Sequence, residues 1–195
     1  MRLKMILLAA VALALVIGLI RGGSLRQMAD VPFRWGWVAI LALALQLFLV
    51  YLPTESQGGL LDPRSWLLTL SYLLLFLVVW GNRRLSGMVI VGLGLLMNFV
   101  VIMANGGFMP ITPEVLRRAG HADLAPRLES GALVSGTKDI VLTREETRLW
   151  ILSDIFVIPS PLPLASAFSP GDLFIALGIF VLLQEAMGAG LFKRI

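Results

Sequence analysis

The stretch GMVIVGLGLLMNFVVIMANGGFMP, residues 87–110, decides the fold class of this chain. Residues 87–104 are almost all apolar, and a run of that length and composition is typical of a helix that crosses a membrane. Asn105-Gly106-Gly107 then ends the helix, because glycine and, next to it, asparagine tolerate the left-handed conformation that terminates helices. Pro110 prevents the helix from resuming. The stretch therefore predicts a membrane span followed by a different kind of structure.

Four further apolar runs have lengths close to that of a span, at about residues 5–20, 36–52, 66–81 and 172–190. The 195-residue chain is 58% hydrophobic and 14% charged, whereas soluble domains are about 45–50% apolar and about 25% charged. We therefore expect an all-α membrane protein, with five transmembrane helices in a single integral membrane domain over residues 1–195. Residues 105–171 would form a cap outside the membrane.

The Lys and Arg residues of the short segments predict the orientation, because cytoplasmic loops are enriched in them. With the N-terminus outside, seven of them face the cytoplasm and three face outward: Arg21, Arg26, Arg34, Arg83, Arg84, Lys193 and Arg194 against Arg2, Lys4 and Arg64. The opposite orientation reverses this ratio. We expect an outer N-terminus, an outer cap and a cytoplasmic C-terminus, with membrane lipids as partners.

The cap contains signals for ordered structure. Thr112 is a candidate N-cap for a helix over 113–119 that begins with Pro113 and ends at Gly120. Thr143 and Glu146 have the spacing of a capping box, which predicts a second helix over 144–152. Residues 157–170 are apolar but contain repeated prolines, which favour an extended arm. The arm would pack on the helices or on a partner.

Composition excludes several kinds of site. The chain has no cysteine, so thiolate metal sites, disulfides and cysteine nucleophiles are excluded. His121 is the only histidine, which rules out a metal or haem site with several histidines from this chain. The cap has six basic and seven acidic residues, so the excess of basic residues belongs to the loops and does not predict nucleic-acid binding. We expect no cofactor and no metal.

The predicted spans contain few polar residues: Gln46, Asn98, Gln184 and Glu185. Polar residues inside membranes mark functional sites or form hydrogen bonds between helices. For Gln46 and Asn98 we favour interhelical hydrogen bonds. Glu185 lies near the cytoplasmic end, where we expect it to pair with Lys193 or Arg194.

Asp154 and Asp172 are the candidates for chemistry. Asp154 follows the predicted second cap helix, and Asp172 opens the last span. Two carboxylates that lie close together can share a proton and activate water. Alternatively, Asp172 caps its own helix and Asp154 pairs with Arg144 or Arg148. We favour the second interpretation.

Several stretches of the chain resemble an uncharacterised bacterial family of multi-span integral membrane proteins, a domain of unknown function. These stretches are RGGSL (21–25), Leu45-Gln46, NGGFMP (105–110), TRLWILSDI (147–155) and FSPGDLFIALGIF (168–180). The resemblance covers nearly the whole chain. It implies a bacterial membrane protein and assigns no catalytic residue.

The stretch FSPGD, which ends at Asp172, is also similar to a motif of lipoprotein signal peptidases, small helical membrane aspartyl peptidases. Their second catalytic aspartate ends a phenylalanine-asparagine-x-alanine-aspartate stretch at the start of the last helix. The similarity implies a catalytic role for Asp172, with Asp154 in the place of the first aspartate. The chain departs from this pattern around Asp154, where Ile151 replaces the asparagine three residues earlier and no arginine follows.

Three functions compete. The first is a non-catalytic accessory subunit of a larger bacterial membrane complex, such as an energy-converting one, and it is favoured by the near absence of ionisable residues in the spans. The second is a membrane-interface aspartyl hydrolase or peptidase that uses Asp154 and Asp172. The third is a carrier of a small or lipophilic solute, which the odd number of spans and the absence of a visible inverted repeat disfavour.

Overall fold

Five long helices dominate the computed structural model, which describes residues 5–51, 59, 61–120, 129–162 and 165–189. They are α1 (Met5–Ile20), α3 (Gly36–Tyr51), α4 (Pro63–Gly81), α5 (Ser86–Ala104) and α7 (Pro170–Ala186). Each overlaps one predicted apolar run, which confirms the helical segments, although α7 ends at Ala186 and residues 187–189 of the last predicted span are not helical. Residues 52 and 190 of the predicted spans lie outside the described residues. A short helix, α2 (Leu25–Ala29), connects α1 to α3.

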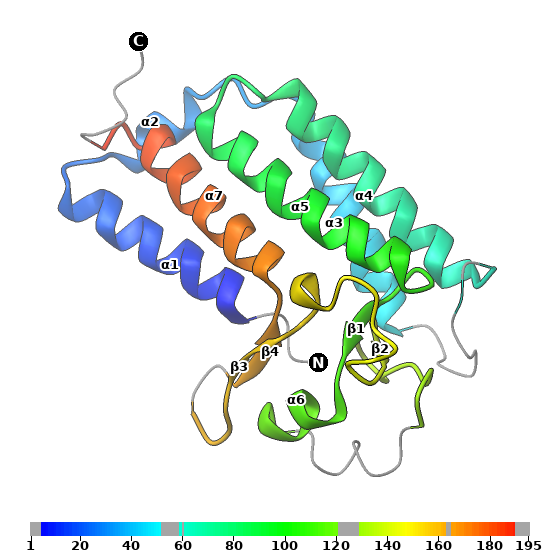
Figure 1. Cartoon of the computed structure of the whole chain (residues 1–195). Coiled ribbons are helices and arrows are strands. Elements are labelled where there is room, and N and C mark those ends of the chain that lie inside the picture. Colours follow the sequence, from blue (N-terminus) through cyan, green and yellow to red (C-terminus); the bar gives the residue numbers. More distant parts are fainter. Residues whose placement is uncertain (1–4, 52–58, 60, 121–128, 163–164, 190–195) are drawn as a thin grey trace.

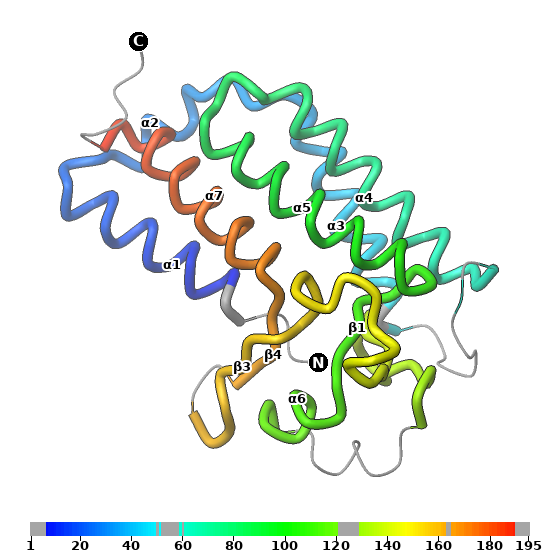
Figure 2. Tube along the Cα trace, in the orientation of Figure 1, coloured from blue at the N-terminus to red at the C-terminus, as the bar shows by residue number. Residues whose placement is uncertain are grey.

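The long helices lie side by side and alternate in direction along the chain (Figure 1). Contacts run from α1 to α7, from α7 to α5, from α5 to α4 and from α4 to α3. One end of the bundle carries the connections made by residues 21–35 and 82–85, and we call it the loop end. The other end carries the described parts of residues 105–169, and we call it the cap end; the tube in Figure 2 shows these parts gathered there.

Two of the described helices, α4 and α5, are long and apolar enough to cross a membrane, and each has 19 residues. At about 1.5 Å per residue, such a helix is close to the thickness of the hydrocarbon core, about 30 Å. Helices α1 and α3 are shorter, with 16 residues each.

Glycines set the closest contact of the bundle, between α5 and α7. A Cβ atom on Gly94 would lie 2.5 Å from the Gly171 carbonyl oxygen, and one on Gly178 would lie 2.5 Å from the Val91 nitrogen. One on Gly87 would overlap the backbone of Leu182. Small residues let two helix backbones approach closely. Such close packing drives helix association in lipid, because burying apolar side chains there gives no hydrophobic driving force.

The cap is not purely helical, so the expectation of an all-α chain is wrong there. Strand β1 (Met109–Ile111) pairs in parallel with β2 (Asp139–Val141), and Met109 is opposite Asp139. Helix α6 (Pro113–Arg118) confirms the predicted helix over 113–119, because the Thr112 side chain accepts a hydrogen bond from the Val115 N–H. Sequence periodicity misses three-residue strands because they are too short to show a pattern.

The predicted second cap helix over 144–152 is wrong: its described part contains only a single 3₁₀ turn, η2 (Trp150–Leu152). The predicted contacts between Thr143 and Glu146 do form, since the Thr143 N–H donates to Glu146 and the Glu146 N–H donates to the Thr143 hydroxyl. Leu149 then adopts a left-handed conformation with φ 54°. That conformation costs about 1–2 kcal/mol for a residue with a side chain and interrupts a right-handed helix.

The proline-rich arm is a hairpin rather than one extended segment. Strand β3 (Phe156–Ile158) pairs with β4 (Ser166–Phe168) in antiparallel fashion, and the rings of Phe156 and Phe168 stack with their centres 5.5 Å apart. Residues 163 and 164 of the predicted arm lie outside the described residues. The extended conformation is confirmed for residues 157–158 and 166–168, whereas residues 160–162 turn the chain and Pro170 already begins α7.

Candidate functional site

Asp172 lies in the first turn of α7, inside a buried polar cluster with Asn98 and Ser169. Its Oδ1 accepts a hydrogen bond from the Asn98 side chain at 3.0 Å, and its Oδ2 accepts one from the Ser169 N–H at 3.1 Å. The Ser169 hydroxyl accepts from the Asp172 N–H at 3.0 Å and donates to Asn98 Oδ1 at 2.7 Å. Ser169 and Asp172 thus form a reciprocal capping box at the N-terminus of α7, and Asn98 joins it to α5.

Glycine makes room for this cluster. A Cβ atom on Gly171 would overlap the side-chain oxygen of Asn98. Only a residue without a side chain therefore lets the start of α7 approach α5 closely enough for Asn98 to reach Asp172. Both carboxylate oxygens of Asp172 accept hydrogen bonds that stabilise a helix end and a helix contact.

Asp154 is also buried, and Asp154 and Asp172 are each 2% exposed. The Asp154 N–H donates to the carbonyl of Pro110, which attaches the residue to the beginning of the cap. The turn η2 just before it packs against α5 and α7. The structure therefore places both aspartates at the cap end of the bundle, one in the cap and one in α7.

The other polar residues of the long helices connect neighbouring helices. Gln46 of α3 donates to the Ser71 hydroxyl of α4 at 3.1 Å, and Gln184 of α7 donates to the carbonyl of Ala14 in α1 at 2.7 Å. These are contacts of the kind that holds helices together in a membrane.

Glu185 has a role that the sequence does not reveal. Its two carboxylate oxygens accept hydrogen bonds from the N–H groups of Ser86 and Gly87, each at 3.1 Å. A carboxylate at this place satisfies unpaired N–H groups at the N-terminus of α5 and interacts favourably with the helix dipole. Its predicted partners, Lys193 and Arg194, lie outside the described residues.

Two asparagines at the ends of long helices connect segments that are distant in the sequence, and the sequence analysis did not predict these contacts. Asn82 Oδ1 accepts from the Arg34 N–H, and its amide donates to the carbonyls of Arg34 and Val78. Asn105 binds Arg148 in the same way, and its amide also donates to the Val101 carbonyl. We call these two arrangements asparagine clamps. The helix stop at Asn105 was predicted, but nothing local indicates a partner 43 residues away.

On the described surface of the cap, the carboxyl group of Glu146 has a shifted pKa. Hydrogen bonds from the Ser130 hydroxyl and from the N–H and hydroxyl of Thr143 hold the pKa of Glu146 below its usual range. The exposed carboxylate of Glu146 connects two segments of the cap. Its partners are neutral hydroxyl and amide groups, so the arrangement does not suggest catalysis.

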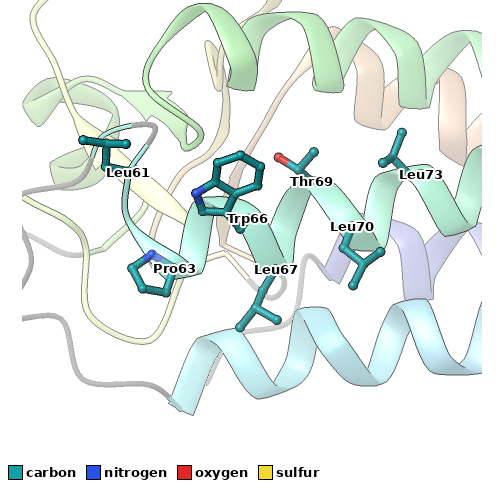
Figure 3. A pocket seen from close by; sticks show the side chains of 7 residues that line it. All are labelled: Leu61, Pro63, Trp66, Leu67, Thr69, Leu70 and Leu73. Carbon is teal, nitrogen blue, oxygen red and sulfur yellow. The ribbon is translucent and has the colours of Figure 1, made fainter.

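An apolar groove with a volume of about 820 Å³ runs along the surface of α4. Figure 3 shows Leu67 and Leu70 on the side of α3, and Trp66 and Thr69 on the side of α5. Leu61, Pro63 and Leu73 complete its lining. The groove has one hydroxyl group and no charge, so it offers contact to hydrocarbon rather than a place for chemistry.

Among the described residues, no three His, Asp or Glu side chains come together in a way that could hold a metal ion. His121, the only histidine of the chain, lies outside them. The described polar side chains are thus committed mainly to helix ends and helix contacts.

Residues 30–184 match the family of unknown function DUF5317. The chain belongs to this family. The match covers most of the chain of this DUF5317 protein, from just before α3 to Gln184, and includes both asparagine clamps and both aspartates. No curated protein and no solved structure matches it. The similarity to lipoprotein signal peptidases stays a prediction.

Proposed function

We propose that all five long helices of this DUF5317 protein cross a bacterial cell membrane as one domain, with the cap end outside and the C-terminus in the cytoplasm. The helices alternate in direction and lie side by side (Figure 1). A membrane that is crossed by α4 and α5 would therefore also contain the other three long helices. Large apolar side chains are exposed on all five, for example Leu13, Ile40, Leu70, Val89 and Leu177. Such side chains would be unfavourable in water and suit lipid.

The charge at the loop end supports the proposed orientation. Five arginines are exposed there, namely Arg21, Arg26, Arg34, Arg83 and Arg84. Two of them lie over tryptophan rings, Arg83 over Trp80 at 4.3 Å and Arg34 over Trp35 at 5.9 Å. Basic and aromatic residues together are typical of a cytoplasmic membrane interface with anionic lipid.

We further propose that the protein is a non-catalytic accessory subunit of a larger membrane complex. The observation that supports this most is the use of Asp172: both oxygens of its carboxylate are engaged in the capping box and the contact with Asn98. The cap also exposes apolar side chains, with Ile151 68% exposed and Phe156 and Leu162 exposed as well. Apolar groups at such a place suit the surface of a partner protein.

Purification of the tagged protein from its native membrane in a mild detergent tests this proposal. A partner should co-purify in a fixed ratio, and Ile151→Glu should release it without lowering the melting temperature of the isolated chain. Glu114→Gln, a change at another exposed position of the cap, should keep the partner. A chain that purifies alone from native membranes under these conditions would contradict the proposal.

An aspartyl hydrolase is the second candidate, because Asp154 and Asp172 are both buried at the cap end. In that case Asp154→Asn and Asp172→Asn should each abolish hydrolysis of a membrane-anchored peptide while the melting temperature of Asp154→Asn stays unchanged. If Asp172 is instead only a structural cap of α7, we expect a different result: Asp172→Asn lowers the melting temperature, and the wild-type protein shows no hydrolysis.

A further inference from the structure

The loop end of the bundle carries an excess of positive charge. Its two connections, residues 21–35 and 82–85, contain five arginines and one acidic residue, Asp30. All five arginines are exposed. Glu185 of α7 also lies at this end, but its carboxylate already accepts hydrogen bonds from two N–H groups at the start of α5. The positive charge of the arginines is thus largely uncompensated by the described residues of the loop end.

The asparagine clamp of the loop end holds two distant segments together at the surface. Asn82 Oδ1 accepts a hydrogen bond from the Arg34 N–H, and the Asn82 amide donates to the Arg34 carbonyl, both at 2.8 Å. The ring of Trp35 lies against Gly81, because a Cβ atom on Gly81 would be 2.7 Å from that ring. Arg34 and Trp35 are thereby fixed beside the last turn of α4.

The arginine in each of these two segments lies over a tryptophan ring. The guanidinium carbon of Arg34 is 5.9 Å from the centre of the Trp35 ring, and that of Arg83 is 4.3 Å from the centre of the Trp80 ring. Arg83 Nη1 also donates to the Trp80 carbonyl at 3.1 Å. Neither guanidinium group forms an ion pair within the described residues. The rings stabilise the two cations at the surface and leave most of their N–H donors available.

We call Arg34, Trp35, Trp80 and Arg83 the arginine–tryptophan patch. We propose that this patch binds headgroups of anionic phospholipids in the leaflet at the loop end, which is the cytoplasmic leaflet in the proposed orientation. Phosphate oxygens accept charge-assisted hydrogen bonds from guanidinium groups, and tryptophan rings favour the level of the headgroups. The excess positive charge favours lipids with a net negative charge. Trp35 and Trp80 are 38% and 64% exposed, and both arginines are exposed, so headgroups reach the patch from the surrounding leaflet without a cavity.

Binding of short-chain lipids to the full chain in maltoside micelles tests the proposal. The probes are dioctanoyl phosphatidylglycerol, which is anionic, dioctanoyl phosphatidylcholine, whose phosphate is balanced by a positive charge, and glycerol phosphate, which has no acyl chain. We expect phosphatidylglycerol to bind and to raise the melting temperature, and the other two probes to bind about tenfold more weakly. Arg34→Gln and Arg83→Gln should each weaken binding of phosphatidylglycerol about fivefold.

Arg26→Gln is the matched control, because it removes one positive charge from an exposed position at the same end, on α2, which packs against α7. It should leave binding unchanged. The clamp holds the backbone of Arg34 and not its side chain, so the patch variants should keep the wild-type melting temperature without lipid. The proposal is overturned if phosphatidylcholine or glycerol phosphate binds as tightly as phosphatidylglycerol, if either patch variant binds like the wild type, or if Arg26→Gln weakens binding equally.

The lipid proposal rests on the proposed membrane crossing, and the two can fail separately. Micelles have no sides, so binding of phosphatidylglycerol does not depend on which end of the bundle faces the cytoplasm. If the loop end is shielded from an impermeant reagent in intact cells but phosphatidylglycerol is not preferred, the lipid proposal alone is overturned. If phosphatidylglycerol is preferred but the loop end is labelled in intact cells and the cap end is protected, the proposed orientation alone is overturned.

Discussion

The loop end and the cap end of the bundle are closed by the same device, an asparagine clamp. Asn82 ends α4 and binds the backbone of Arg34, and Asn105 ends α5 and binds the backbone of Arg148. In both cases the residue after the arginine has a left-handed backbone, with φ 61° at Trp35 and φ 54° at Leu149. At these irregular positions the asparagine side-chain amide thus forms the hydrogen bonds that a neighbouring backbone would form in a regular helix or strand.

What differs is the segment that each clamp holds. After Trp35 the long helix α3 begins, so the clamp at Asn82 joins two long helices. After Leu149 only the turn η2 forms, so the clamp at Asn105 joins a long helix to the cap. The same local arrangement therefore stabilises the helix bundle at the loop end. At the cap end it stabilises the position of the cap.

The largest difference between the two ends should come from the glycines beside the clamps. Gly107 has φ 90°, and a Cβ atom there would overlap the Ser65 side chain. Gly107→Ala should therefore cost about 2–5 kcal/mol from backbone strain and overlap together. Gly81→Ala meets the Trp35 ring at 2.7 Å, a side chain that can shift, and should cost about 1–3 kcal/mol. Denaturant unfolding in micelles measures both, and an equal loss would contradict the distinction.

The clamps themselves should give the next largest effects. Asn82→Ala and Asn105→Ala each leave backbone groups of an arginine without their partner, at a cost of about 1–3 kcal/mol. Asn82→Ala should lower the free energy of unfolding of the whole bundle. Asn105→Ala should mainly open the cap, seen as faster protease cleavage near residues 148–152 with a smaller change in global unfolding. The reverse pattern would show that the cap, and not the loop end, stabilises the bundle.

The smallest effect should be a pH dependence confined to the cap. Because the pKa of Glu146 is lowered in the folded protein, its contribution is present above the unfolded pKa of about 4.3 and is lost as pH falls through the folded pKa. The melting temperature of Glu146→Gln should therefore be below that of the wild type at pH 6, and the two should converge at lower pH. Glu145→Gln is the control for loss of one exposed carboxylate. A constant difference at all pH values would contradict the assignment.

Sequence reasoning succeeded where the signal is local. The five apolar runs and the helix from Pro113 to Arg118 were found because length, capping by Thr112 and termination by Gly120 are properties of neighbouring residues. It failed over residues 144–152, where the capping contacts formed but Asn105 holds the Arg148 backbone and Leu149 turns the chain away. Glu185 at the start of α5 was missed for the same reason, because its partners lie 98 and 99 residues away in the chain.

The two ends also provide the most direct measurement of the central claim, that the bundle crosses a membrane with its cap outside. The chain has no cysteine, so single cysteines report without interference. Leu61→Cys and Ser130→Cys mark the cap end, and Arg26→Cys and Ser86→Cys mark the loop end; all four positions are exposed. In intact cells an impermeant thiol reagent should label the first two, and the other two only after the membrane is opened. Labelling of Arg26→Cys or Ser86→Cys in intact cells, with Leu61→Cys and Ser130→Cys protected, would contradict the orientation, and labelling of all four would contradict the crossing.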